Sequence, residues 1–436
     1  MAGGVKKPIN IFKLKNTGDP PQIFNWRLWF AVLAFGLMGA ARGVDEGLIN
    51  GAFKSPKFQK SINLKSYSEV EQTNIKGNVS AMVQIGSEVP TSLHLMFATT
   101  IFCLSFLQYE SPRFLIRKGR IQEAISTLSH IRKLPPTDPY IVHEIHGIET
   151  HWQEEQEATL GQGWLGILKE IFLVRSNFYR LYLGFFAQIM SQWSGAGSIT
   201  LYAVDLFALL GIKGNNESLL ATAIFGIVKF CAAVACALFL VDVIGRKRAL
   251  LLGITLQAIA MTYIAGFLSA VPKLGVDDDF ELPDRQKGAS IGAIFMIYLS
   301  GFGWALGWNS MQYLLTAELF PLRIRAINTG IVMAAHFANQ YGNSRAVPNM
   351  LLPVSSGGMD PKGTFWFFAA VTVLGGIWVL VTVPETAGRD LESMDRLFAL
   401  PWYKIGLYGN RDADVKDEVA NEKESPSVTH VEKTKV

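Results

Sequence analysis

Charged side chains are scarce in this sequence. They make up 17% of its 436 residues, whereas a soluble protein carries roughly a quarter. Half of the residues are apolar, and the missing charges leave several long windows of almost pure hydrocarbon. Because such windows are typical of membrane helices, the composition excludes an ordinary soluble protein. It predicts an all-α, polytopic integral membrane protein.

Other features are also missing. Three cysteines cannot form a disulfide framework, and Cys231 and Cys236 fall in an apolar run, where cysteine is usually a small core residue. The net charge is only +4 and no basic cluster alternates with aromatic residues, so we expect no nucleic-acid partner. No metal-ligand cluster, nucleophile elbow or phosphate loop is present, so we expect neither enzymatic activity nor a metal or other cofactor. Residues 1–22 do not resemble a cleaved signal peptide.

Long apolar segments are what the sequence does contain. A helix needs about 20 apolar residues to cross a bilayer. Helices are favoured over other structures because an unpaired backbone amide in hydrocarbon costs several kcal/mol. We expect eight spans, at 27–50, 78–108, 181–211, 219–241, 249–271, 289–313, 326–352 and 364–383. An even number of crossings leaves both termini on one side.

Loop charges predict which side that is, because cytoplasmic loops are rich in lysine and arginine. Three basic residues, Arg246 to Arg248, follow the fourth span, whereas the loop from Asp277 to Asp284 is acidic. We therefore expect both termini in the cytoplasm. One loop on the expected outer side disagrees, because it carries Lys54, Lys57, Lys60, Lys65 and Lys76.

These elements divide the chain into five parts. They are a cytoplasmic tail (1–26), a short N-terminal transmembrane half (27–109), a cytoplasmic helical linker (110–180), a six-helix C-terminal transmembrane half (181–400) and a charged tail (401–436). The last part contains few large apolar residues, so we expect it to be disordered. In the linker, apolar residues at helical spacing predict an amphipathic helix over 121–131, which Pro135 and Pro136 separate from a second helix over 140–157.

Charged motifs follow the spans. They are Glu110-Ser111-Pro112-Arg113 with Lys118-Gly119-Arg120, Asp242-Val243-Ile244-Gly245-Arg246-Lys247, Glu318-Leu319-Phe320-Pro321 with Arg323 and Arg325, and Pro384-Glu385-Thr386 with Gly388 and Arg389. In this order, each at the expected cytoplasmic end of a span, they resemble the sugar porter family of the major facilitator superfamily, above all its fungal, quinate-permease-like members. The resemblance runs from about residue 40 to 400. It implies transport of a monosaccharide, polyol or quinate-like acid by alternating access, with or without a coupled proton.

The resemblance also implies a role for these charges. Carboxylates and arginines at cytoplasmic helix ends can pair across helices while the inner gate is closed, and they must separate when it opens. The expected members of this latch are Asp242, Arg246, Glu318, Arg323, Arg325, Glu385 and Arg389. The alternative is that the arginines only anchor helix ends on the cytoplasmic side and the carboxylates are solvated.

The number of spans departs from the family, which has twelve in two halves of six. Residues 26–50 resemble its first helix, 77–87 the start of its second and 89–109 its sixth. Most of helix two and all of helices three to five are therefore missing. We expect this chain alone to transport poorly or not at all. Two alternatives are a non-transporting membrane sugar sensor and the non-functional product of a truncated gene; the oligomeric state is left open.

Polar side chains within spans predict the solute site, because they are costly in lipid. Gln188 and Gln192 lie four residues apart, on one helix face, in a stretch that resembles the family's sugar-binding motif. Gln192 matches the second glutamine of that motif, but Ser191 replaces the first and Gly197 replaces its asparagine. By position in the family, the other expected contacts are Gln312, Tyr313, His336 and Phe337. His336 could instead be a hydrogen-bonded residue between helices.

Two charged residues complete the expected site. Lys229 lies in the middle of a span, where a lysine costs roughly 2.5–3.5 kcal/mol, and it would suit a carboxylated solute; the alternative is a side chain that extends to the membrane surface. Asp45, at the outer end of the first span, is the expected proton carrier, because apolar neighbours favour its protonated form. The family pairs this acid with an arginine on the fourth helix, which this chain lacks. The expected partners are thus a small solute, a proton in the coupled case and the lipid bilayer.

Overall fold

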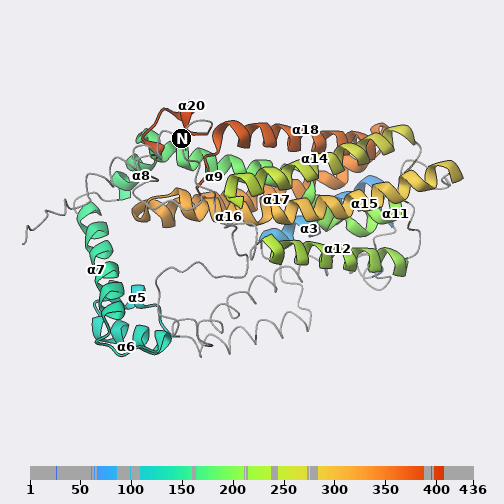
Figure 1. Ribbon diagram of the computed structural model, residues 1–436. Helices are drawn as coiled ribbons and strands as arrows, with labels where there is room; N and C mark the ends of the chain where they lie inside the picture. The colour runs from blue at the N-terminus through green and yellow to red at the C-terminus, as the bar shows by residue number, and fades with distance from the viewer. Residues whose placement is uncertain are drawn as a thin grey trace, which may run out of the picture. The chain divides into compact units, whose positions relative to one another are not determined.

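The computed structural model describes residues 66–85, 109–159, 164–210, 215–236, 244–272, 283–386 and 397–406, with Trp26, Lys60, Asn63, Thr99, Ile212, Leu274 and Met394. The regular secondary structure of these segments is helical (Figure 1). The chain divides into two compact units. One is built from residues 1–55 and 87–164, and the other from residues 56–86 and 165–436.

The smaller unit contains the predicted linker helices. Its helices are α5 (Pro112–Arg117), α6 (Ile121–Arg132) and α7 (Pro139–Thr159). Their buried apolar side chains include Leu115, Ala124, Leu128, Ile141 and Ile145. The two helices predicted from the apolar spacing are thereby confirmed, to within one or two residues at each end.

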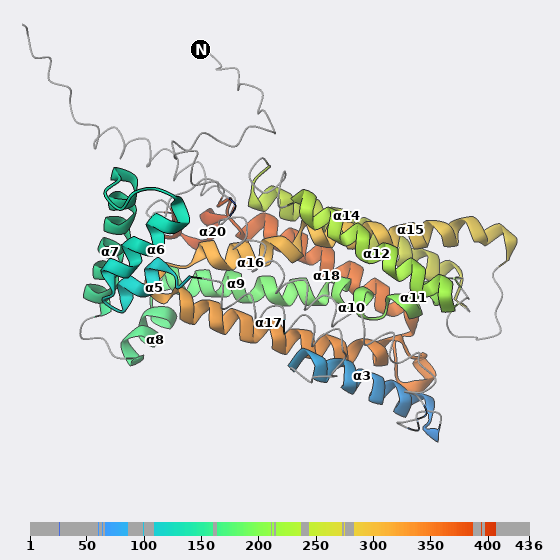
Figure 2. The ribbon, with the colours of Figure 1, turned by 90° about the horizontal axis from the view of Figure 1, so that it is seen from below.

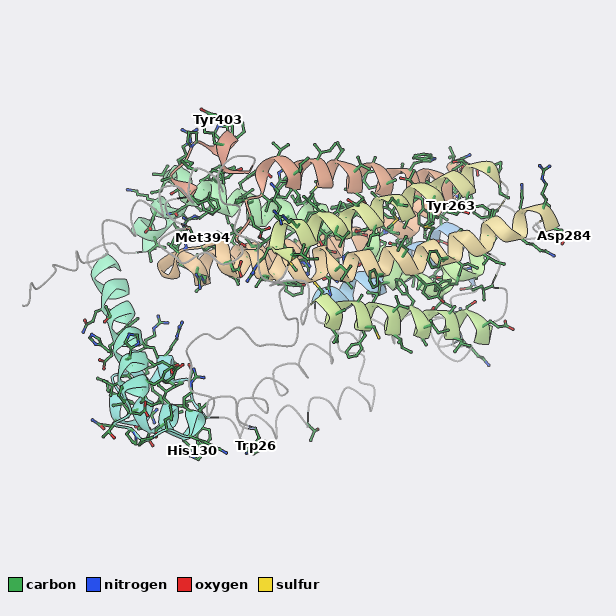
Figure 3. All side chains as sticks on the ribbon, viewed as in Figure 1. Trp26, His130, Tyr263, Asp284, Met394 and Tyr403 are labelled. Carbon is green, nitrogen blue, oxygen red and sulfur yellow. The ribbon has the colours of Figure 1, made fainter. Side chains whose placement is uncertain are left out.

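The larger unit is a helix bundle. Its helices are α3 (Glu69–Ile85), α8 (Trp164–Leu173), α9 (Arg175–Trp193), α10 (Ala196–Leu201), α11 (Ala203–Leu209), α12 (Asn215–Ala235), α14 (Arg246–Ala270), α15 (Asp284–Leu306), α16 (Trp308–Leu319), α17 (Leu322–Leu351), α18 (Asp360–Thr382) and the single turn α20 (Trp402–Ile405). Helix α14 packs against α15 and α18, and α17 lies between α9 and α3 (Figure 2). Met394 and Tyr403 lie at one end of the bundle and Asp284 at the other (Figure 3).

The outside of this bundle is apolar. Large side chains such as Leu220, Phe230, Phe295 and Leu374 are 60% or more exposed. Within the described residues, three helical runs are long and apolar enough to cross a membrane, namely Arg246–Ala270, Asp284–Leu319 and Asp360–Thr382. Apolar side chains on an outer surface are unfavourable in water but suit hydrocarbon, so this surface fits the lipid that the sequence predicts.

The predicted span 181–211 is not one helix, which corrects the expectation. Helix α9 ends at Trp193, and Gly195 adopts a left-handed backbone with φ of +86° before α10 begins. A Cβ atom at this position would lie 2.5 Å from Cγ of Phe368. Both the backbone angle and the close ring require glycine. The chain turns again at Tyr202 before α11.

The predicted span 289–313 is also interrupted, at Gly307, between α15 and α16. At this break the backbones of α14 and α15 lie close together. A Cβ atom on Gly253 would lie 2.5 Å from the amide nitrogen of Gly307 and would also collide with the carbonyl oxygen of Gly303. Small residues let helix backbones approach this closely, and the sequence pattern of a span does not reveal such a crossing.

The remaining boundaries agree in part. Helices α12, α14, α17 and α18 correspond to the spans predicted at 219–241, 249–271, 326–352 and 364–383. The span 27–50 and most of 78–108 lie outside the described residues. Helix α9 starts inside the segment predicted as linker. In the tail predicted to be disordered, residues 402–405 instead form a helical turn whose Ile405 is buried, which is a further correction.

Candidate functional site

Four predicted site residues meet inside the larger unit. Atom Nδ1 of His336 on α17 lies 2.9 Å from Oε1 of Gln188 and 3.2 Å from Nε2 of Gln192, both on α9. Its other ring nitrogen, Nε2, lies 3.2 Å from the hydroxyl of Tyr313 on α16. The two glutamines and His336 are at most 6% exposed. We call Gln188, Gln192, Tyr313 and His336 the polar cluster.

Local sequence explains this convergence. Gln188 and Gln192 are one helical turn apart, so they share one face of α9. One turn before His336, the methyl groups of Val332 lie against Gly184 of the same face of α9. The close approach of these two helices brings the imidazole within hydrogen-bond distance of both amides.

Tyr313 and Phe337 connect the cluster to the surface of the unit. Their side chains are 38% and 42% exposed, and both rings meet the imidazole of His336 edge to face, at centroid distances of 5.6 and 5.3 Å. The side chains of the predicted residues Gln312 and Tyr313 therefore have different surroundings. Tyr313 reaches the imidazole, whereas Gln312 is buried elsewhere on α16.

Several buried polar atoms of the larger unit are unsatisfied. Among the described residues, no hydrogen-bond partner is found for Nε2 of Gln188, Oε1 of Gln312 or either amide atom of Asn328. An unpaired polar atom in a dry interior costs about 1–3 kcal/mol. Such atoms are expected where a ligand or water completes the hydrogen bonding.

Helix α17 carries more polar contacts than the sequence reasoning selected. Asn343 donates from Nδ2 to the carbonyl oxygen of Gln192 and accepts a 2.5 Å bond from the hydroxyl of Ser198. Asn339 accepts a hydrogen bond from the indole of Trp193, at 3.3 Å. Both asparagines lie in the predicted span 326–352, so the cost of polar side chains in lipid also points to them.

The break after α9 has its own polar partner, which was also missed. Atom Nε2 of the fully buried Gln257 on α14 donates to the carbonyl oxygen and the hydroxyl of Ser194, at 3.0 and 2.9 Å. The hydroxyl of Thr372 on α18 adds a 3.3 Å bond to the same carbonyl. These bonds satisfy a backbone group that the interrupted helix leaves open.

Lys229 has other neighbours. Its ammonium group donates to the hydroxyl of Thr200, at 2.8 Å, and lies over the rings of Trp304 and Phe225, at 4.4 and 5.5 Å. Cation–π contact stabilises a desolvated ammonium by about 2 kcal/mol. None of these three residues belongs to the polar cluster, so the structure does not unite the predicted lysine with the predicted glutamines.

The expected latch residues that the structure describes meet at one end of the bundle. The guanidinium of Arg246 lies 3.2 Å from the carboxylate of Glu318, which also accepts a 2.7 Å bond from Thr386. The carboxylate of Glu385 accepts hydrogen bonds from the backbone amides of Arg246 and Lys247.

The other expected charges are placed less fully. Arg325 donates from Nε to the carbonyl oxygen of Phe320. Asp45, Asp242 and Arg389, together with the side chain of Arg323, lie outside the described residues.

The motif that opens the linker forms a small network in the other unit. The guanidinium of Arg120 bridges the carboxylates of Glu110 and Glu123, at 2.9 and 2.5 Å. The hydrogen bond from Arg120 holds the pKa of the Glu123 carboxyl below its usual value. This bridge ties the start of α5 to the first turn of α6.

Comparison with known proteins adds the following. Residues 84–398 match the family model described as Sugar (and other) transporter. The "Probable quinate permease" of Aspergillus niger is 32% identical over 310 residues, which are 71% of this chain and 55% of that protein. The quinate permease of Neurospora africana is 31% identical over 313 residues, or 72% and 56% of the two chains. The chain thus spans about half the length of the curated relatives it matches.

Solved structures show the same fold. The proton:xylose symporter XylE of the major facilitator superfamily, bound to 6-bromo-6-deoxy-D-glucose, superposes with a TM-score of 0.53 and 21% identity. The match covers 75% of this chain and 67% of that one. A double-tryptophan mutant of XylE gives a TM-score of 0.54. The helical, polytopic fold predicted from the apolar segments is confirmed by this likeness.

Proposed function

This chain belongs to the family of sugar (and other) transporters, and we propose that its polar cluster binds a small polyhydroxylated solute. Membership in this family confirms the prediction of an integral membrane protein. That the chain acts as a transporter rather than an enzyme is part of the proposal. The solute class we propose is a monosaccharide, a polyol or a quinate-like acid. It is supported by the quinate permeases among the relatives.

One observation carries this proposal. The imidazole of His336 and the amides of Gln188 and Gln192 converge from two helices inside the bundle. A hydroxylated ring offers both donors and acceptors, and amides and an imidazole can match both. Within the polar cluster, the unsatisfied atom Nε2 of Gln188 is one that a solute would complete. Lys229 stays a candidate contact for a solute carboxylate.

Transport would follow the alternating access of the family, in which two halves rock around a solute site. We propose that Arg246, Glu318 and Glu385 act in the inner latch, together with Asp242, Arg323, Arg325 and Arg389. Asp45 is the proposed proton carrier in the coupled case. We further propose that the chain lies in the plasma membrane with both termini in the cytoplasm.

Activity of this chain is proposed to be impaired. The predicted first half holds two spans where the family has six, and the chain covers 55% of its A. niger relative. A transport path that lacks much of its first half supports binding of a solute more readily than its passage across the membrane. We therefore expect saturable binding of solute with weak uptake or none.

The test uses the full-length chain in two assays. Uptake of labelled glucose and quinate is measured in yeast cells that lack their own carriers, and binding of the same compounds is measured on the purified protein. Gln192→Ala is expected to weaken binding about tenfold, the equivalent of one lost hydrogen bond of about 1.4 kcal/mol. Gln286→Ala, a glutamine at the start of α15, is the control and is expected to change nothing. Robust saturable uptake would overturn the impairment, and absence of any binding would overturn the proposed solute site.

A further inference from the structure

Helix α8 is too short to cross a membrane. It has ten residues, Trp164–Leu173, and so spans about 15 Å, which is half of a hydrocarbon core of about 30 Å. Seven of the ten residues are apolar, and only Lys169 and Glu170 are charged. An apolar helix of this length is either covered by protein or lies at the membrane surface. The exposure of its side chains distinguishes these two positions.

One side of α8 packs against the larger unit. Ile171 is fully buried in a cluster with Phe320 and Ile324, and Ile167 packs against the same cluster. Phe320 directly follows α16, and Ile324 lies in the first turn of α17. These contacts hold α8 at the end of the bundle that carries the expected latch residues, beside the start of α9 (Figure 1).

The other side of α8 is apolar and exposed. Leu165 and Leu173 are 75% and 76% exposed, and Phe172 is 48% exposed. Val174, which connects α8 to α9, is also exposed. Exposed apolar side chains then continue along α9 at helical spacing, with Phe178, Tyr182 and Phe185. The exposed side of α8 is therefore continuous with the outer surface of the bundle that fits lipid.

This continuity identifies the bilayer as the partner of α8. Exposed leucine and phenylalanine side chains are unfavourable in water, and acyl chains already surround the adjoining surface of α9. The helix cannot move deeper into the bilayer, because Ile171 is fixed against Phe320 at the helix ends. A short apolar helix held at this level lies in the plane of the membrane boundary, between headgroups and acyl chains.

Two basic side chains accompany the apolar ones. Lys169 is four residues from both Leu165 and Leu173, so the three share one face of α8, and Arg175 is the first residue of α9. Both basic side chains are exposed, and within the described part of the chain neither has an ion-pair partner. Glu170 is turned toward the protein, with Oε2 buried. A long basic side chain can extend from an apolar face to lipid phosphates, and cations next to a membrane attract anionic lipid.

We propose that α8 is an interfacial membrane helix that binds anionic phospholipid. Its apolar face enters the boundary between headgroups and acyl chains at the latch end of the bundle, and Lys169 and Arg175 bind the acidic headgroups of lipids such as phosphatidylserine. This role does not depend on the solute site. Because only Val174 separates α8 from α9, the lipid also holds the start of the helix that carries Gln188 and Gln192.

The first experiment measures the depth of α8 in vesicles of phosphatidylcholine and phosphatidylserine. The three cysteines of the full-length chain are replaced by alanine, and a spin label is attached to Leu165→Cys or Leu173→Cys. Its accessibility to oxygen, which enriches in acyl chains, is compared with that to a water-soluble nickel complex. Both labels are expected about 5–10 Å below the phosphates.

Two reference labels calibrate this depth. Phe295→Cys lies on the exposed apolar side of α15 and should be deeper, whereas Gln122→Cys lies on the exposed side of α6 and should be in water. Labels on α8 that are as accessible to nickel as the one on α6 would overturn the interfacial position. Exclusion of both oxygen and nickel would overturn it as well, because protein would then cover the helix.

The second experiment measures the preference for anionic lipid at the same place. A fluorophore on Leu173→Cys is quenched by phosphatidylserine or phosphatidylcholine with a spin-labelled headgroup, which gives the relative affinity of the two lipids near α8. Phosphatidylserine should be preferred, and Lys169→Gln or Arg175→Gln should each lower the preference about fivefold. Arg285→Gln, which removes an exposed arginine at the opposite end of the bundle, is the control. Equal affinity for both lipids, or the same loss in the control, would overturn the lipid site.

The unmodified chain provides an independent check. Phosphatidylserine with a photoreactive acyl chain should crosslink to the peptide 164–175, and the crosslinked residues are identified by mass spectrometry. Glycerophosphoserine, which has the headgroup without acyl chains, should not reduce this crosslinking. Competition by the soluble headgroup would indicate a site for free phosphate compounds and would overturn the proposed lipid site. Absence of any crosslink in this peptide would overturn it too.

Discussion

The carboxylate of Glu385 lies 2.7 Å from the backbone nitrogen of Arg246, and 3.3 Å from that of Lys247. These two amides belong to the first turn of α14, where backbone N–H groups have no acceptor within the helix. Glu385 is 139 residues away in sequence from Arg246, at the end of the segment that follows α18. The motif that follows α18 thereby caps α14, the helix that starts within the Asp242–Lys247 motif.

Replacing Glu385 with alanine should destabilise the larger unit. The variant loses an acceptor for two helix N–H groups and a negative charge at a helix N-terminus, which together are worth about 1–2 kcal/mol. The measurement is the midpoint of thermal unfolding of the purified protein in detergent. Asp284→Asn, which removes a negative charge but no acceptor for another helix's amides at the exposed start of α15, serves as control and should lower the midpoint less than Glu385→Ala does. Equal midpoints for both variants would contradict the capping role.

Gly253→Ala should separate α14 from the α15–α16 break. The new methyl group would collide with backbone atoms of Gly303 and Gly307, and backbone cannot move aside as a flexible side chain can. Overpacking of this kind costs about 1–3 kcal/mol. The matched control is Gly226→Ala on α12, where nothing lies within 4 Å of the added atom; this change should be neutral or stabilising. The same detergent unfolding assay distinguishes them.

Gln257→Leu should destabilise the fold by about 1–3 kcal/mol, because it leaves the hydroxyl and carbonyl of Ser194 short of a buried donor. Leucine keeps most of the volume, so the loss is one of hydrogen bonding rather than packing. Thr255→Val on the exposed side of the same helix is the control. An unfolding midpoint for Gln257→Leu as high as that of the control would show that the Ser194 bonds contribute little.

Arg246 and Glu318 should be energetically coupled. Their side chains are 15% and 27% exposed, so their attraction is screened less than that of a surface pair. A double-mutant cycle with Arg246→Gln and Glu318→Gln should give a coupling free energy of about 1 kcal/mol. Additive effects of the two substitutions on unfolding would count against a closed latch in this state. The exposed pair Lys287 and Asp284 provides a reference cycle, for which coupling near zero is expected.

The sequence predicts the apolar architecture of this protein well. Spans such as 249–271 and 364–383 correspond to α14 and α18, because a long apolar run in a helical period has few other stable structures. His336, Gln188 and Gln192 could be anticipated as partners, since polar side chains in lipid are expected to satisfy one another.

The breaks within the predicted spans 181–211 and 289–313 could not be predicted from the pattern of apolar residues. The break at Gly195 depends on the ring of Phe368, and the one at Gly307 depends on Gly253 of another helix. Both involve residues distant in sequence, whereas hydrophobic periodicity reports only on one helix at a time. Gln257 and Asn343 lie outside the family motifs on which most of the predicted contacts rest, although every buried polar side chain of a span needs a partner.

The polar residues of helix α17 have a consequence for its insertion into the membrane. It carries His336, Asn339, Asn343 and Arg345 over three turns, and it is not among the three described runs that are apolar enough to cross a membrane by composition. Amide, imidazole and guanidinium groups disfavour partitioning of a single helix from the translocon into lipid. The partners that offset this penalty, Gln188 and Gln192 for His336 and Asn74 for Arg345, sit on α9 and α3, which are synthesised earlier. Insertion of α17 should therefore depend on α3 and α9, which reach the translocon first. We expect these helices to enter the membrane together rather than one after another.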